Sequence, residues 1–430
     1  MPSVAKILIV FLGMLSLLRI RIPMGIAIIL GAIALNFWAG QLPGKILASL
    51  GAGLCQTYLW LLVLVTALIV MFGQYLSTEK NSRIILSLAR RWGGRHGRLW
   101  SLIAAPAVIG LIPMPAGALF SAPLIEQSVR EKHWQPAWKA AINFWFRHIW
   151  EYWWPVYPAV IIALAVFKMP TWQYMLSLIV FTPVSLLAGY FFLLRPHRSR
   201  LLLTERQQPA ESVQSLLSVL LPIGLILGCA LFLPPVIAQI GSPCDVQISK
   251  LLSILIGIAV GLAVIFLSSG RKFIVSSLAS LVKVRSLNIL LTVGSIILFQ
   301  FMLNESSLLP SASHELLGSG IPIFLVIMLL PLLAGVLTGM AVGFAGLSFP
   351  LIVGLMNVEG SSLTPMATLV LAYGFGYVGV LISPLHLCLL VSRDYFSSSL
   401  LPLYKQIAPC VGTVIVFTIL LFSFFHAYGW

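Results

Sequence analysis

Charge is scarce in this sequence. Of its 430 residues only 9% are Asp, Glu, Lys or Arg, whereas 60% are hydrophobic. Soluble domains carry about 25% charged residues, so a water-soluble fold could not cover this much apolar surface. Disorder is excluded as well, because it requires low hydrophobicity. The long unbroken apolar runs predict an all-α, polytopic membrane protein rather than a barrel of short alternating segments.

The sequence also lacks the common catalytic and metal-ligand signatures. It contains no P-loop and neither the zinc-protease nor the serine-hydrolase motif. Its five cysteines are scattered, without a CxxC pair or a cysteine–histidine cluster. We therefore expect no enzyme, no cofactor and no metal site, and we interpret four of the cysteines as small apolar fillers.

Negative charge is rarer than positive charge: 11 Asp and Glu stand against 26 Lys and Arg. No basic run is interleaved with aromatic residues outside the apolar segments, so we expect no nucleic-acid partner. In a membrane protein, Lys and Arg mark cytoplasmic loops. We expect the protein in the inner (cytoplasmic) cell membrane. The topology that puts most Lys and Arg residues on the cytoplasmic side places both termini on the opposite side.

Ten apolar runs are long enough to cross a membrane. Two further apolar stretches, about 99–129 and 321–357, are broken near the middle by small residues and proline. Lipid cannot satisfy the backbone at such a break, so we interpret both as re-entrant hairpins; two full, kinked spans each is the alternative. The ten runs are about 4–20, 23–40, 56–77, 138–167, 172–194, 215–234, 249–268, 287–303, 363–393 and 408–428.

The two halves of the chain resemble each other. Ser121-Ala-Pro-Leu-Ile, for example, matches Ser348-Phe-Pro-Leu-Ile. We divide the chain into an N-terminal repeat (1–194), a cytoplasmic linker (195–214) and a C-terminal repeat (215–430), each repeat with five spans and one hairpin. Five crossings would invert the second repeat, and inverted repeats with broken helices are typical of secondary transporters.

Polar residues within the run 138–167 mark a candidate site. Asn143, Arg147 and Glu151 are spaced by four, which places them on one helix face. Ionisable groups at membrane depth cost roughly 2.5–3.5 kcal/mol each and persist when they pair or face a cavity. We predict that Arg147 and Asn143 bind an anion and that His148 or Glu151 couples protons. The alternatives are a structural salt bridge, or an interfacial position suggested by the neighbouring aromatic residues.

Small residues at the hairpin tips extend this site. Their backbone N–H groups and hydroxyls could bind substrate, although the same residues also permit a sharp turn. We expect a small molecule or ion as substrate, Na+ or H+ as coupling ion, and the lipid bilayer as surroundings. The candidates are Pro115, Gly117 and Ser121 in the first hairpin, Gly343, Gly346 and Ser348 in the second, and Ser383 before the predicted break at Pro384.

Three segments resemble one family of uncharacterised prokaryotic integral membrane proteins, a domain of unknown function in the ion transporter superfamily. The resemblance implies the inverted-repeat, two-hairpin fold, substrate binding between hairpin tips and broken helices and, by analogy, a homodimer. The Ser-Asn-Thr signature of dicarboxylate carriers is absent from both tips. The segments are Pro113-Met-Pro-Ala-Gly-Ala-Leu-Phe-Ser-Ala-Pro123, Phe146-Arg-His-Ile-Trp-Glu-Tyr-Trp-Trp-Pro-Val-Tyr-Pro158 and Gly379-Val-Leu-Ile-Ser-Pro-Leu-His-Leu-Cys-Leu389.

These features together predict a secondary active transporter, an ion-coupled carrier of a small organic anion. The alternative is a cation/proton antiporter in which Glu151 and His148 exchange ions.

Overall fold

The computed structural model describes residues 2–76, 97–111, 117–129, 134–201, 213–240, 246–269, 271–306, 308, 311–312, 315, 322–356 and 363–429. Within these ranges every regular element is a helix, which confirms the predicted all-α class. The α-helices are α1 Ser3–Arg19, α2 Met24–Trp38, α3 Pro43–Leu54, α4 Thr57–Leu76, α6 Gly97–Gly110, α7 Ala118–Ser128, α8 Pro136–Trp145, α9 Pro158–Phe167, α10 Thr171–Ile179, α11 Phe181–Gly189, α12 Arg198–Leu201, α13 Val213–Ile240, α14 Val246–Ser269, α15 Arg271–Leu281, α16 Val284–Asn304, α18 Ile323–Thr338, α19 Ala341–Met356, α20 Pro365–Ile382, α21 Leu387–Tyr395 and α22 Leu400–Ala427.

Several helices are long and apolar enough to cross a membrane. Among the described residues four qualify, and α3 with α4 gives a fifth if their 53° bend is counted as a break within one span. The protein is therefore a multi-pass membrane protein. Other predicted spans coincide with shorter apolar helices, so the number of ten crossings stays a prediction. The four are continuous helical stretches, some of which join several of the helices named above. They are Thr171–His197 (α10, α11 and the turns that follow), Ser286–Asn304 (within α16), Pro365–Tyr395 (α20 and α21) and Leu400–Ala427 (α22).

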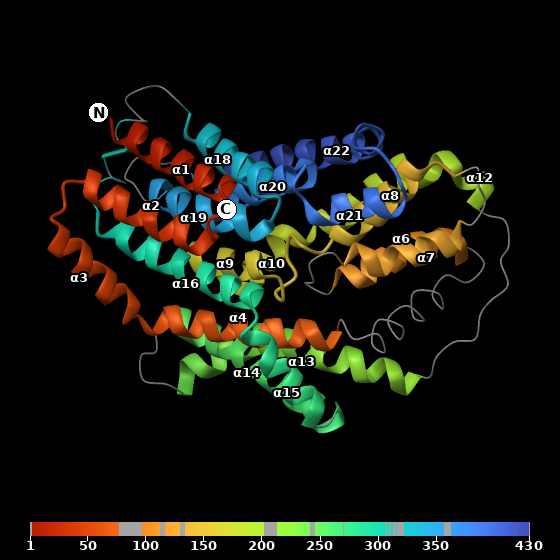
Figure 1. Ribbon diagram of the computed structural model, residues 1–430, viewed down its shortest axis with the longest axis horizontal. Coiled ribbons are helices and arrows are strands. Elements are labelled where there is room, and N and C mark those ends of the chain that lie inside the picture. Colours follow the sequence, from red (N-terminus) through yellow and green to blue (C-terminus); the bar gives the residue numbers. More distant parts are fainter. Residues whose placement is uncertain are drawn as a thin grey trace.

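Each predicted hairpin contains a pair of packed helices. α6 packs against α7 and α18 against α19, and Figure 1 shows the two pairs in opposite halves of the long axis. The second pair turns at Gly339, whose φ of 64° is left-handed and where a Cβ would lie 2.8 Å from the backbone nitrogen of His386. Glycine is required there for both reasons. The first turn, with Pro115, lies outside the described residues. The re-entrant position of either pair stays a prediction.

Two of the predicted spans are broken. The run 363–393 divides into α20 and α21 on either side of Pro384, which cannot donate a backbone hydrogen bond. The run 138–167 divides into α8 and α9. Here the α-helix ends at Trp145, well before Pro155, and a 3-10 turn, η2 (Phe146–His148), and further turns follow. The expectation that Arg147 and Glu151 share an α-helical face is therefore wrong.

The helices that surround these breaks pack in a reciprocal pattern. α2 of the first half packs against α16 of the second half, while α14 of the second half packs against α4 of the first. Figure 1 shows α4, α13 and α14 along one side of the molecule, with α20 and α22 on the other. Of the broken helices, α9 lies between these two sides and α20 forms part of the second. The proposed repeat boundaries stay a prediction.

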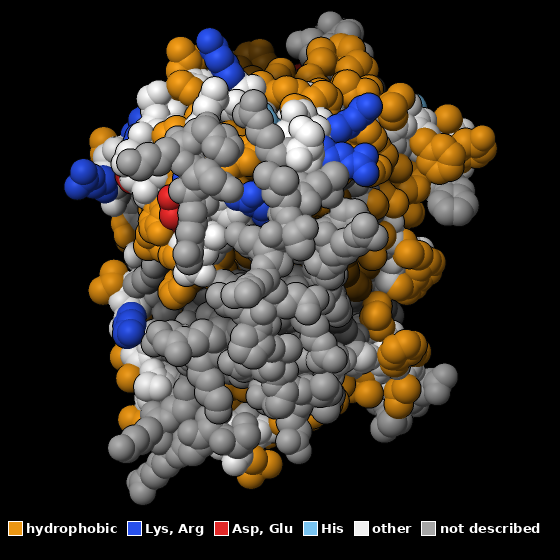
Figure 2. Space-filling view, turned by 90° about the vertical axis from the view of Figure 1, so that its right-hand side faces the viewer, with side chains coloured by type: hydrophobic (Ala, Val, Ile, Leu, Met, Phe, Trp, Pro, Cys, Tyr) orange, Lys and Arg blue, Asp and Glu red, His pale blue; other side chains and the backbone are white. Residues whose placement is uncertain are grey.

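Basic side chains are visible on one end face of the molecule. Figure 2 shows Lys and Arg in the upper part of this end and hydrophobic side chains along one edge. Two basic residues also hold α7: Arg98 Nε donates to the carbonyl of Ser128 at 2.6 Å, and Lys139 Nζ donates to Glu126 at 3.1 Å. Arg98 thus joins the two helices of the first hairpin to each other, and Lys139 joins the hairpin to α8.

Glu315 caps the first helix from a distant part of the chain. Its carboxylate accepts hydrogen bonds from the backbone N–H groups of Ser3 (2.7 Å) and Val4 (3.0 Å), which begin α1. Helix N-termini leave these groups without intrahelical partners and attract negative charge. The two backbone donors lower the pKa of Glu315.

Replacing Glu315 with Gln should lower the thermal unfolding midpoint at neutral pH, because the cap loses its charge. Since the folded-state pKa of Glu315 is depressed, its contribution is present above the ordinary pKa of a glutamate and is lost as the pH falls through the depressed value. The two proteins should therefore converge in acid. Glu305→Gln is the control, and equal midpoints at every pH would contradict the capping role.

Candidate functional site

The break between α8 and α9 leaves backbone carbonyls without helical donors inside the protein. α8 begins with Pro136 and α9 with Pro158, both at positions where a missing N–H is tolerated. The residues between Phe146 and Tyr157 are buried or half-buried. Buried carbonyls need hydrogen-bond donors, so side chains of other helices must supply them.

Hydroxyl groups of three other helices donate to this segment. Tyr373 and Tyr377 of α20, which are one helical turn apart, reach into the break from the second half of the chain. The donors are Tyr377 Oη to the His148 carbonyl (2.9 Å), Thr182 Oγ1 to Ile149 (2.7 Å), Tyr373 Oη to Glu151 (2.6 Å) and Tyr174 Oη to Tyr152 (3.0 Å).

Aromatic residues of the same segment cap the first hairpin. The C-terminal carbonyls of α6 accept from Trp150 Nε1 (to Ala107, 2.7 Å), Trp154 Nε1 (to Leu111, 3.2 Å) and Tyr157 Oη (to Gly110). Their polar atoms therefore bond within the protein, and Trp154 is only 6% exposed. The alternative of an aromatic belt at the membrane interface does not fit this arrangement.

The charged groups of the site meet at Glu151. Its Oε1 lies 3.8 Å from Arg147 Nη1 and 3.8 Å from His148 Nε2. Charge-assisted hydrogen bonds are about 2.7–2.9 Å long, so both contacts are loose. All three side chains are buried, and Arg147 is 2% exposed. The guanidinium rests on the start of α7, where a Cβ at Gly117 would lie 2.7 Å from Arg147 Nε.

Asn143 joins three helices beside this group. Its Nδ2 donates to the carbonyl of Ala118 on α7 and to Ser392 Oγ on α21, both at 3.0 Å. Its Oδ1 accepts from Ser121 Oγ of α7 at 2.5 Å. Both amide hydrogens and the carbonyl are thus engaged with protein, which favours a positioning role for Asn143 and Ser121. Their predicted contact with substrate remains a prediction.

Comparison with known proteins places the chain in a family. A family model described as "Protein of unknown function (DUF401)" matches residues 3–424. The chain belongs to this family. No curated protein matches the sequence. A crystal structure of the Alcanivorax borkumensis YdaH transporter, described as revealing an unusual topology, is similar with a TM-score of 0.54 and 15% identity. The match covers 86% of this chain and 85% of that one.

At this low identity the likeness shows a shared fold and no more. The expectation of an uncharacterised membrane protein family is confirmed by the DUF401 match. Membership of the ion transporter superfamily is not shown by these comparisons and stays a prediction.

The candidates of the second hairpin and Ser383 contact side chains and backbone groups of the second half of the chain, together with Ile28 of α2. Gly346 packs against Ile296 and Ile28, and Gly343 against Thr338. Hydroxyl groups bond to backbone: Ser348 Oγ to Phe344 of its own helix (2.6 Å) and Ser383 Oγ to Val336 of α18 (2.6 Å). Their predicted role in substrate binding remains untested, as does that of Pro115.

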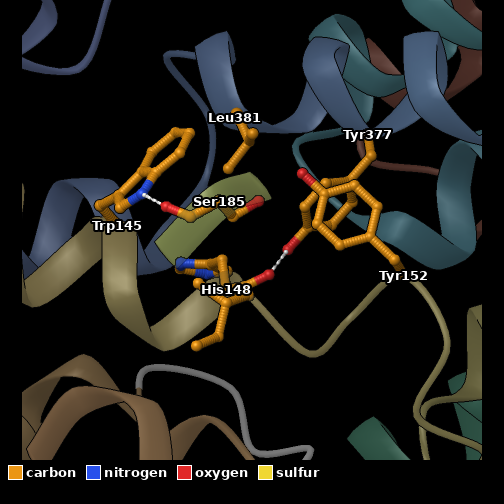
Figure 3. Close-up of a pocket in the computed structure, with 7 residues that line it drawn as sticks. Trp145, His148, Tyr152, Ser185, Tyr377 and Leu381 are labelled. Carbon is orange, nitrogen blue, oxygen red and sulfur yellow. Dashed lines mark hydrogen bonds between the residues drawn. The ribbon is translucent and has the colours of Figure 1, made fainter. Parts of the chain in front are cut away.

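Sequence reasoning missed two residues of the centre. His386 and Cys388, at the start of α21, lie beside His148, and the rings of His148 and His386 are 4.7 Å apart at 81°. The sequence shows no cysteine–histidine cluster, but the folded protein brings Cys388 together with two histidines, so that expectation is wrong. The available signal was the His-Leu-Cys spacing after Pro384. Figure 3 shows a small pocket beside His148, lined on one side by Tyr152 and Tyr377 and on the other by Trp145 and Leu381.

Replacing Tyr373 with Phe should destabilise the fold by about 1–3 kcal/mol, because the buried Glu151 carbonyl loses its donor. Tyr428→Phe is the control, since Tyr428 is exposed at the end of α22. Thermal unfolding of the two purified variants measures the difference. A Tyr373→Phe protein as stable as the control would show that the break does not depend on this hydroxyl.

Replacing Gly110 with Ala should also destabilise the protein, because the added Cβ would lie 2.9 Å from the carbonyl carbon of Arg147. A backbone segment cannot shift to make room as a flexible side chain can. We therefore expect the free energy of unfolding to fall by an amount near the upper end of about 1–3 kcal/mol. Gly412→Ala is the matched control: it lies in α22 with open space at its Cβ position, where Ala is the better helix former. Equal unfolding midpoints for the two variants would refute the close approach.

Proposed function

We propose that this protein is a secondary active transporter, an ion-coupled carrier of a small organic anion. The class is supported by the fold shared with a transporter structure and by the apolar helices. The observation that supports an anion as substrate is Arg147, a buried guanidinium at a helix break, 3.8 Å from the carboxylate of Glu151. Ionisable residues inside membrane proteins mark substrate and ion pathways.

The shared carboxylate offers a means of coupling. When Glu151 is ionised, it pairs with Arg147 and competes with a substrate anion for the guanidinium. Protonation of Glu151 ends that competition, so a proton and an anion would bind together. His148 would exchange the proton, and its Nε2, 3.8 Å from the same carboxylate oxygen, supports this role. This scheme selects H+ rather than Na+ as the coupling ion.

The architecture we propose for transport is an inverted repeat with two re-entrant hairpins. The reciprocal packing of α2 on α16 and of α14 on α4 supports the repeat, and the opposite placement of the helix pairs α6–α7 and α18–α19 supports the inversion. The cations at one end of the molecule support a cytoplasmic position for that end, and both termini would then lie outside the cytoplasm.

Transport by proteoliposomes tests this proposal. Uptake of a radiolabelled carboxylate from a mixed panel should rise when the outside is made acid relative to the inside. Arg147→Gln should reduce it roughly 10- to 100-fold, which corresponds to a lost charged hydrogen bond of about 1.5–3 kcal/mol. Glu151→Gln should retain anion exchange but lose the response to the pH gradient.

The matched control is Arg393→Gln, because Arg393 pairs with the exposed Asp394 at 2.6 Å, away from the break. Unchanged uptake in Arg147→Gln and Glu151→Gln would overturn the site. Cation-induced pH changes without any organic anion would instead establish the cation/proton antiporter.

A further inference from the structure

We infer that His148, His386 and Cys388 form a binding site for a soft transition-metal ion, with monovalent copper as the best match. The site does not depend on the proposed transport activity, and a metal ion on His148 Nε2 would prevent that nitrogen from exchanging a proton with Glu151. His148 comes from η2 and the other two from the start of α21, so the two halves of the chain both contribute. Their ligating atoms all lie within 4.8 Å of one another, and all three residues are less than 9% exposed.

Both imidazoles are oriented as metal ligands usually are. Nδ1 of His148 is 2.5 Å from the carbonyl of Phe144, and Nδ1 of His386 is 3.0 Å from the carbonyl of Val380. A carbonyl can only accept, so each Nδ1 carries the proton and each Nε2 presents a lone pair. A backbone bond at one nitrogen that fixes the tautomer for ligation by the other is the common second shell of metal-bound histidine.

The protein does not itself satisfy the lone pair of His148 Nε2. His148 Nε2 is buried and has no hydrogen-bond partner of good geometry among the described atoms, although the thiol of Cys388 is directed towards it. Buried polar atoms normally have partners. A metal ion between the two Nε2 atoms and Sγ would satisfy all three groups after a contraction of about 1 Å, since ligand atoms around a first-row metal are roughly 3.3–3.8 Å apart.

The ligand set and the local charge select the metal. Thiolate sulfur favours Cu(I) and Zn(II) over Mg(II) and Ca(II), and imidazole is compatible with either of the first two. Arg147 and Glu151 neutralise each other as an ion pair, so Cu(I) with the Cys388 thiolate would leave the buried centre neutral. Zn(II) would leave one net positive charge beside Arg147, which a site of low polarity disfavours.

Metal binding by the full-length protein in detergent tests this inference. We would use a variant in which the other four cysteines, Cys55, Cys229, Cys244 and Cys410, are changed to Ser, so that only Cys388 can supply sulfur. Titration with Cu(I) against a chromophoric chelator should give one bound ion per chain. X-ray absorption at the copper edge should show one sulfur and two nitrogen neighbours.

Two further substitutions in that background separate a three-ligand site from a reactive thiol. Cys388→Ser and His386→Gln should each weaken Cu(I) binding by at least about tenfold. His426→Gln, at the exposed end of α22, is the control and should bind like its parent. Binding that survives His386→Gln unchanged, a spectrum without nitrogen neighbours, or a preference for Zn(II) over Cu(I) would each overturn the inference. The same absorption spectrum recorded on the wild-type protein needs no substitution at all, so misfolding of a variant cannot hide the answer.

Discussion

Buried backbone carbonyls at the break between α8 and α9 are the constraint on which the centre of this protein depends. Where the helix ends at Trp145, hydroxyls of α10, α11 and α20 take the place of helical N–H donors. The aromatic residues of the break in turn satisfy the carbonyl end of α6. Each element is therefore held by a polar bond to another, in surroundings where lipid or dry protein offers no substitute.

The same constraint brings the two halves of the chain together. Tyr373 and Tyr377 reach the break from α20, and Asn143 reaches Ser392 of α21. These bonds set His148 beside His386 and Cys388, while Arg147 is set over Gly117 of the first hairpin. The charged pair of this centre, Arg147 and Glu151, comes from the first half. The second half supplies hydroxyls, an imidazole and a thiol, so the two halves have different chemical tasks despite their similar patterns.

Much of the local structure follows from the residues themselves. Apolar runs predict the helices. Pro384 and the small residues near Gly339 predict where helices stop, because proline has no backbone N–H to donate and a left-handed turn favours glycine. The cluster of Asn143, Arg147, His148 and Glu151 also stands out as polar residues in an apolar run. The aromatic residues around Trp150 were ambiguous, since rings with a polar atom suit both a membrane interface and a buried carbonyl.

The sequence by itself determined the membrane class, the all-helical fold, the break at Pro384 and the polar residues of the first break, whose position it placed too late in the chain. Hydropathy and the loss of backbone donors are local properties, so a single chain segment reveals them. Only the tertiary structure decided that Glu151 lies between Arg147 and His148 outside a regular helix, that Asn143 is occupied by protein, and that His386 and Cys388 join the centre. Those outcomes depend on contacts between residues up to 249 positions apart, and no spacing along one helix encodes them.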